Sequence, residues 1–152
     1  MVVSSDVELG FPRGTRDERE LFLRWLRFLR GAVIRKVEGL SDEQARWTPD
    51  GALICLVGIV NHLTHVEWRW IDGGMLGQET SRSDAEFAPG RELTVELALA
   101  AYRERAAATD ATVMATPLDQ PVPVGTRSRL ALGPAPPGQR DRSPRWPRRR
   151  HP

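Results

Sequence analysis

Three stretches of the chain repeat apolar residues at steps of three and four, the spacing that places side chains on one face of a helix. The first predicted helix runs from Thr15 to Gly39, and Thr15 followed by Glu18 has the spacing of a capping box. Gly39 is expected to end it, and Ser41 with Gln44 repeats the capping pattern over a short turn. Its apolar stripe consists of Phe22, Trp25, Leu26, Leu29, Val33 and Val37.

The other two predicted helices differ in how much of their surface is apolar. The second, from Leu53 to Ile71, carries apolar residues over more than half of its circumference and is expected to be the most buried. Gly73 and Gly74 should stop it, and the polar stretch from Gln78 to Gly90 is typical of a loop. The third helix, from Val95 to Ala115, has a narrower apolar stripe. The expected core residues are Trp25, Leu29, Leu56, Val60, Leu63 and Leu99.

Three such helices predict an all-α fold, an up-and-down helical bundle in which each apolar stripe faces a neighbouring helix. Short connections indicate antiparallel neighbours. The bundle is predicted to occupy residues 15–125, after a flexible N-terminus at residues 1–14. Because the second helix is apolar on several sides, it needs more neighbours than two helices provide. We therefore expect three helices to be retained and a fourth to be missing.

The composition of the chain changes just after Gly125. Residues 126–152 hold 8 Arg, 6 Pro and one acidic residue, and they have no helical apolar stripe. Since proline lacks an amide hydrogen and clashes with the preceding helical turn, this segment is predicted to be a disordered tail in place of the fourth helix. The sequence pI near 9.3 comes from this tail, because acidic residues outnumber basic ones in residues 1–125.

Charge, hydropathy and cysteine content limit which classes of partner and which cellular compartment we expect for the protein. A basic tail can bind nucleic acid or an anionic membrane surface, but this one lacks the regularly placed aromatic residues that stack on bases, so we expect no nucleic-acid partner. The longest apolar stretch, from Ala52 to Val60, is far shorter than the ~20 residues that span a bilayer. A single cysteine, Cys55, and the lack of a signal-peptide pattern indicate a reducing cytoplasm.

The cluster of potential metal ligands in residues 15–125 consists of His62, His65 and Glu67. On a helical wheel His62 lies at the edge of the apolar arc, Glu67 lies inside it, and His65 lies on the polar side. One interpretation is that His62 and Glu67 face inward and bind a metal. The other is that His62 is a core histidine bonded to a carbonyl and that Glu67 pairs with an arginine of another helix. Spacing alone favours the second, because a metal site usually needs three protein ligands.

Three segments resemble the DinB superfamily, in particular its DUF664 branch. They are ERELFLRWL from Glu18, KVEGLSDEQA from Lys36, and LVGIVNHLTHVEW from Leu56, and the last is the most specific. The resemblance implies a four-helix bundle that commonly holds a divalent metal of the zinc or nickel type. It also implies, for some relatives, a low-molecular-weight thiol such as mycothiol or bacillithiol as a partner. In this pattern His62 is a metal ligand, whereas His65 and Glu67 match less closely.

The two other ligands implied by the family pattern stand four residues apart on the last helix, as His-x-x-x-His or Glu-x-x-x-His, and the chain has neither pair. When codons compatible with Ala131 to His151 are read one base later, they can encode the helical string RWVLLHLVSETARHAGHADVI, which contains Glu-x-x-x-His. We call it the shifted-frame string, and the chain that carries it at residues 131–151 the shifted-frame protein. With 21 Arg and one Lys, the chain is typical of GC-rich DNA, in which a wrong frame yields Arg and Pro. We therefore interpret residues 126–152 as out of frame, through a frameshift or a mispredicted gene end.

Three functions compete for this sequence. The first is an ancestral divalent-metal-dependent enzyme acting with a small thiol, for which the chain as written should bind metal weakly or not at all and be inactive. The second is a non-catalytic helical module whose exposed apolar groove makes it self-associate or recruit a partner. The third is a nucleic-acid binder that uses the basic tail and weakens with salt. The substrate is left open, because a fold does not determine a reaction.

Overall fold

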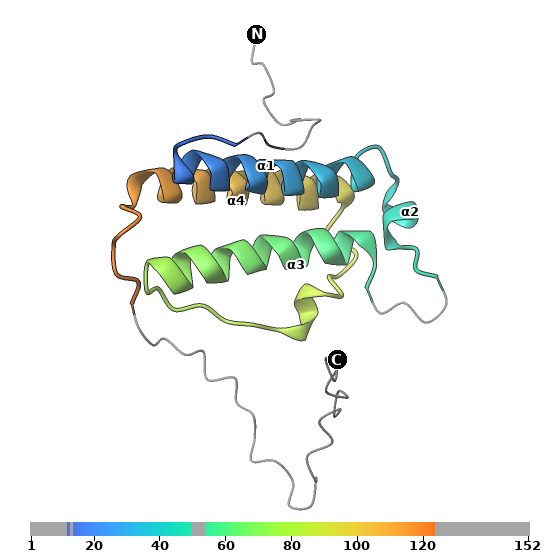
Figure 1. Cartoon of the computed structure of the whole chain (residues 1–152). Helices are drawn as coiled ribbons and strands as arrows, with labels where there is room; N and C mark the ends of the chain where they lie inside the picture. Colours follow the sequence, from blue (N-terminus) through green and yellow to red (C-terminus); the bar gives the residue numbers. More distant parts are fainter. Residues whose placement is uncertain (1–11, 13, 50–53, 124–152) are drawn as a thin grey trace, which may run out of the picture.

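All regular structure in the described part of the chain is helical (Figure 1). The computed structural model describes residue 12 and residues 14–49 and 54–123. The elements are α1 (Glu18–Val37), α2 (Asp42–Arg46), α3 (Leu56–Trp68), the π-helical η1 (Arg69–Met75), the 3₁₀-helical η2 (Asp84–Glu86) and α4 (Val95–Ala115). The predicted all-α fold with three main helices is confirmed. The predictions for residues 1–11, 13 and 126–152 concern positions outside the described residues.

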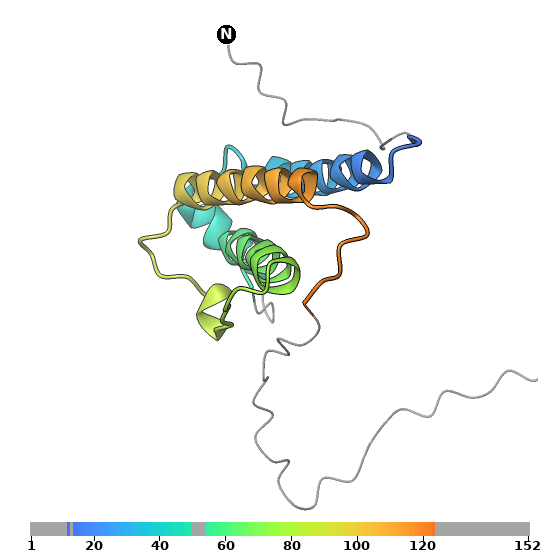
Figure 2. The same ribbon diagram turned by 90° about the vertical axis from the view of Figure 1, so that its left-hand side faces the viewer.

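The three long helices form two layers. Helices α1 and α4 lie side by side in one layer, and α3 crosses beneath them (Figures 1 and 2). Helix α1 runs in the opposite direction to both α3 and α4, as antiparallel packing requires. Helices α3 and α4 run in the same direction, so the predicted antiparallel arrangement is wrong for this pair, because residues 76–94 return along α3 before α4 begins (Figure 1). This returning segment covers one side of α3.

The N-cap of α1 lies two residues later than predicted. Asp17 accepts hydrogen bonds from the amides of Arg19 and Glu20, at 3.0 and 3.3 Å. The capping box predicted between Thr15 and Glu18 does not form; the Thr15 hydroxyl donates instead to the Glu20 carboxylate. An aspartate cap is favourable because its negative charge also interacts with the positive end of the helix dipole.

The other helix ends follow the predicted turn chemistry more closely. Gly39 has a φ of +82°, which glycine adopts without steric cost, and α1 ends just before it. Ser41 and Gln44 form the predicted capping box at the start of α2. Helix α3 begins at Leu56, and its predicted start at Leu53 lies outside the described residues. Helix α4 has the predicted bounds.

The second helical run extends further than its glycines predicted. Gly73 and Gly74 do not stop it; they lie inside η1, which continues to Met75. A Cβ on Gly73 would lie 2.8 Å from the hydroxyl oxygen of Thr80, so this position needs glycine for close packing and not for a turn. The run ends at Gly77, which has a φ of +71°.

The core lies where the three long helices and α2 meet. Its buried residues are Ile34, Val37, Ala45, Val57, Val60, Val95, Ala98, Leu99 and Tyr102. Of the expected core residues, Val60 and Leu99 are buried, and Leu56 and Leu63 are partly buried against this cluster. The apolar stripes of α3 and α4 therefore predicted the core correctly.

The prediction that Trp25 and Leu29 of α1 lie in the core was wrong. Trp25 is 39% and Leu29 is 54% exposed, and Phe22 beside them is exposed as well. The rotation of α1 is set by Arg30, which is buried and bonds to carboxylates of both α3 and α4. Once Arg30 points inward, Phe22, Trp25 and Leu29 turn outward, whereas Val37 at the end of the predicted stripe stays buried. We call Phe22, Trp25 and Leu29 the α1 strip.

Candidate metal and thiol site on α3

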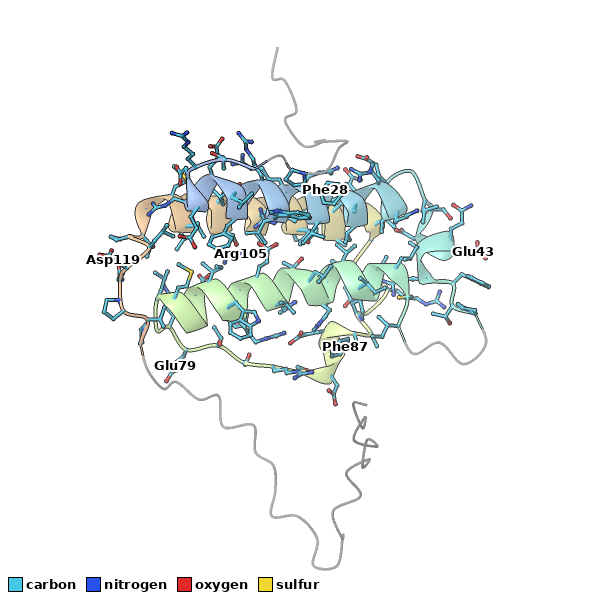
Figure 3. The ribbon with its side chains drawn as sticks, in the orientation of Figure 1. Phe28, Glu43, Glu79, Phe87, Arg105 and Asp119 are labelled. Atoms are coloured by element: carbon cyan, nitrogen blue, oxygen red, sulfur yellow. The ribbon has the colours of Figure 1, made fainter. Side chains whose placement is uncertain are left out.

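His62 lies on the side of α3 that residues 84–87 cover. Its Nδ1 is 3.1 Å from Oε2 of Glu86, and its ring stacks on Phe87 with ring centres 4.3 Å apart. Figure 3 shows Phe87 on the segment beneath α3. The His62 side chain is 26% exposed. The ring is therefore held on one edge and one face and still reaches solvent.

Glu86 is a buried carboxylate whose surroundings fix its position. Its side chain is 4% exposed, and Arg69 donates a hydrogen bond to Oε1. The amide of Ser83 donates to the same oxygen at 3.3 Å, as part of the capping box of η2, and the side chain of Asn61 donates to the Glu86 backbone carbonyl at 2.8 Å. Burial acts to raise the pKa of Glu86, but the hydrogen bonds from Arg69, His62 and Ser83 and the charge of Arg69 lower it overall. Glu86 is therefore ionised at neutral pH.

A glycine on α3 permits this close packing. A Cβ on Gly58 would lie 2.2 Å from the carbonyl oxygen of Phe87, far inside contact distance. Any other residue at this position would push residues 84–87 away from the helix. Gly58, Asn61 and His62 thus form one surface of α3 that receives the returning segment.

His65 lies beside this site without joining it. Its Nδ1 donates to the carbonyl oxygen of Asn61 at 2.8 Å, and its ring meets Trp68 edge to face at 6.3 Å. Both residues border a solvent-open cavity of about 330 Å³. The cavity is lined by Asn61, His65, Trp68, Ser81, Ser83, Ala85 and Glu86. The predicted polar-side position of His65 therefore faces a surface depression that Glu86, the partner of His62, also lines.

Glu67 faces the interior of the bundle. Arg30 of α1 donates to both carboxylate oxygens of Glu67, at 2.7 and 2.6 Å, and donates a third hydrogen bond to Asp110 of α4 at 2.7 Å. Arg27 also donates to Asp110, at 3.0 Å. Burial acts to lower the pKa of Arg30, but its bonds to Glu67 and Asp110 raise it overall. Glu67 thus pairs with an arginine of another helix, the alternative that spacing favoured.

The same interior contains further polar groups of α4. Tyr102 is buried, and burial together with the charge of Glu67 raises its pKa to about 12, although Arg30 opposes the shift. Arg105 bonds to Asp72 at 2.7 Å and lies between α4 and α3 (Figure 3). The interior on this side is therefore held by paired charges that link all three helices.

The predicted ligands are not brought together. In the described part of the chain, no group of three or more His, Cys, Asp or Glu side chains is arranged to hold a metal ion. His62 fits a ligand role, because a carboxylate holds its Nδ1 edge and no described residue hydrogen-bonds to Nε2; His65 has a backbone carbonyl at Nδ1 in place of a carboxylate. Glu67 does not fit in this arrangement, because Arg30 occupies both of its oxygens.

Sequence reasoning missed Glu86, the residue that holds His62. Residues 78–90 were expected to be only a loop, and a partner 24 positions after His62 has no periodic signal. One local signal was present. Ser83 followed by Glu86 has capping-box spacing, the same pattern that correctly indicated the turn at Ser41 and Gln44.

A model of the mycothiol-S-transferase family matches residues 21–139. The match covers well over half of the chain and includes α1 from Leu21 onward, the His62 segment and α4. The chain belongs to the mycothiol-S-transferase family. The resemblance to the DinB superfamily is thereby confirmed, and the match continues past Gly125 to residue 139.

The family is metal-dependent and uses mycothiol. No curated protein and no solved structure matched the chain. Within residues 14–49 and 54–123, no helix of this family member combines the length and the apolar character needed to cross a membrane.

Proposed function

We propose that His62 is one ligand of the divalent metal used by this mycothiol-S-transferase family member, and that the chain as written lacks the other two ligands and is inactive. One observation carries the proposal: Glu86 holds the Nδ1 edge of His62 at 3.1 Å, and Nε2 has no hydrogen-bond partner among the described residues. Histidines that bind metals usually donate their second ring N–H to a carboxylate or carbonyl in this way.

A zinc- or nickel-type ion bound here would lower the pKa of a thiol such as mycothiol, so that the thiolate is available as a nucleophile. Two residues of the chain hold the His62 ring in position for metal binding. Glu86 accepts the Nδ1 hydrogen bond, and Phe87 covers one face of the ring and keeps water from it. The cavity beside His65 and Trp68 is open to solvent and is lined in part by Glu86, the acid that bonds to His62, so it is our candidate entry for a small thiol.

The missing ligands are the ones expected four residues apart on a fourth helix. In our interpretation that helix is encoded one base out of frame with residues 131–151, and the intact protein is the enzyme. Sequencing the coding DNA around Gly125 tests this interpretation directly. A natural reading frame that encodes the Arg- and Pro-rich residues as written would contradict it.

Metal titration tests the role of His62. Zn²⁺ and Ni²⁺ are titrated calorimetrically into the chain as written and into a version that carries the shifted-frame string at residues 131–151. We expect weak binding to the first and tight binding to the second. His62→Ala should weaken the second by more than the ~100-fold that loss of an outer-shell partner costs.

His65→Ala is the matched control, since it removes a histidine three residues away on the same helix and should leave the affinity within a few-fold. Tight binding by the chain as written that survives His62→Ala would contradict the proposal.

A second candidate function is favoured by the α1 strip. Three large apolar side chains exposed in a row on one helix are typical of an interface, so a non-catalytic module that self-associates or recruits a partner fits this surface. Sedimentation velocity across a concentration series tests it. Self-association that Leu29→Lys abolishes and that the exposed control Met114→Lys preserves would support this function; a monomer at every concentration would argue against self-association.

A further inference from the structure

We infer that Glu86 is a positioning residue that holds His62 in the tautomer with its proton on Nδ1 and its lone pair on Nε2. The inference deepens the proposed function, since Nε2 is the atom that would face a metal. The contact itself does not depend on any metal. It concerns two side chains, one on α3 and one on the segment that crosses back over it.

The tautomer follows from what each partner of Glu86 can do. Oε1 accepts hydrogen bonds from Arg69 and from the amide of Ser83, and Oε2 faces Nδ1 of His62 at 3.1 Å. An ionised carboxylate only accepts hydrogen bonds, so Nδ1 must carry the proton. A neutral imidazole has a single N–H, and Nε2 therefore keeps its lone pair. Free imidazole side chains favour the opposite tautomer, so this one needs a partner.

The geometry of α3 brings two of these partners to the same carboxylate. His62 and Arg69 are seven residues apart, close to two helical turns, so both project from one side of the helical run. Arg69 thereby anchors the acid that His62 uses. The Asn61 side chain donates a hydrogen bond to the backbone carbonyl of Glu86 at 2.8 Å. Gly58 has no side chain, so residues 84–87 can approach the helix closely. Four positions on the continuous run of α3 and η1 thus hold Glu86 in place.

The ring of His62 has little freedom to escape this arrangement. Phe87 follows Glu86 in the chain and stacks on the ring at an interplanar angle of 27°. One segment therefore supplies both the acceptor for the edge and the cover for the face. A flipped ring would place a carbon atom opposite Oε2 and lose the hydrogen bond.

His65 provides an internal control on the same helix. Its Nδ1 also acts as a donor, but its acceptor is the backbone carbonyl of Asn61 at 2.8 Å. The tautomer of His65 therefore does not depend on Glu86. Any change at Glu86 should affect His62 and leave His65 unaltered.

Long-range proton–nitrogen correlation NMR of the histidine rings tests the inference on the metal-free full chain at mildly alkaline pH. In the wild type we expect His62 and His65 both to be protonated on Nδ1. In Glu86→Gln, where the amide can donate to Nδ1, the Nδ1-protonated population of His62 should fall at least several-fold while His65 keeps its signals. Glu79→Gln changes an exposed acid of the same segment and should leave both rings unchanged.

Wild-type His62 protonated on Nε2 would overturn the inference, as would an unchanged His62 tautomer in a folded Glu86→Gln variant. If Glu86→Gln does not fold, the wild-type spectrum still decides. A Zn²⁺ titration distinguishes failure of this inference from failure of the proposed function. In the shifted-frame protein, Glu86→Gln should weaken Zn²⁺ binding by about 10- to 100-fold. The predicted tautomers without any Zn²⁺ binding would contradict the proposed function and leave the positioning role standing.

Discussion

Helix α3 has a carboxylate site on each of two sides. The two sites differ in whether a side-chain group is left without a hydrogen-bond partner. On the inner side, Arg30 satisfies both oxygens of Glu67 and one of Asp110, so every charge has a partner. On the outer side, Glu86 is paired with Arg69 and His62, and Nε2 of His62 has no hydrogen-bond partner among the described residues. The inner site joins helices, whereas the outer site holds a group that can still bind something.

This difference also explains the orientation of α1. A buried ion pair is costly to break, because the remaining partner stays buried without its counter-charge. Arg30 therefore fixes which side of α1 faces the bundle, and the α1 strip is left outside. The inner site thus fixes how α1 packs on α3 and α4, and this orientation leaves the α1 strip exposed to solvent.

The largest effect is expected from supplying a fourth helix. Replacing residues 131–151 with the shifted-frame string should raise the free energy of unfolding by about 5 kcal/mol or more, since burying each large apolar side chain contributes ~2 kcal/mol. Urea denaturation measures it, with a scrambled string of equal composition as the control. Equal stability of the two versions would show that no helix fills a face of this bundle.

The next effect concerns the inner site. Glu67→Gln leaves the buried Arg30 with a single carboxylate and should cost ~3–5 kcal/mol in the free energy of unfolding. Glu38→Gln is the matched control, because its pair with Arg103 is solvent-exposed and worth at most ~1 kcal/mol. Chemical denaturation of both variants compares them. Losses of equal size would mean that the buried pair of Glu67 and Arg30 does not clamp α1 to α3.

Alkaline pH should act on the inner site. The pKa of Tyr102 is raised from 10.0 to about 12, so the folded state keeps its proton longer than the unfolded state. The resulting stability is present below pH 10 and is lost as the pH rises to about 12, a loss of ~2–3 kcal/mol. Tyr102→Phe should flatten this part of the stability profile. An unchanged slope in the variant would contradict burial of the phenol.

Acid should act on the outer site, with a smaller effect. The pKa of Glu86 is lowered below 4.5, so its contribution is present above that pH and is lost as the pH falls through the folded-state value. Thermal unfolding between pH 6 and pH 3 should show a shallower loss in Glu86→Gln than in the wild type. A variant that follows the wild-type profile would indicate that Glu86 has no charged partners in solution.

The sequence predicted what depends on neighbours along the chain. The bounds of α4 and the capping box of Ser41 follow from local spacing, and both were correct. Local spacing misled where two patterns competed. Asp17 capped α1 in place of Thr15, and Gly73 allowed close packing where a stop was predicted.

Contacts between distant residues were beyond that reasoning. Wheel positions made Trp25 a core residue, because nothing local shows that Arg30 meets carboxylates 37 and 80 positions away. The same holds for the site. A family motif made His62 a candidate ligand, but Glu86 comes from a loop whose path depends on Gly58 and Phe87 fitting together.

The most direct measurement is a Zn²⁺ titration of the shifted-frame protein, monitored through the NMR signals of its side-chain nitrogens. We predict that Zn²⁺ shifts or broadens Nε2 of His62 and leaves the Nε–H signal of Arg30, which reports the bonds to Glu67, in place. The outer side of α3 would then be the chemical site and the inner side the clamp. A titration that moves the Arg30 signal and leaves the His62 ring unchanged would contradict this assignment.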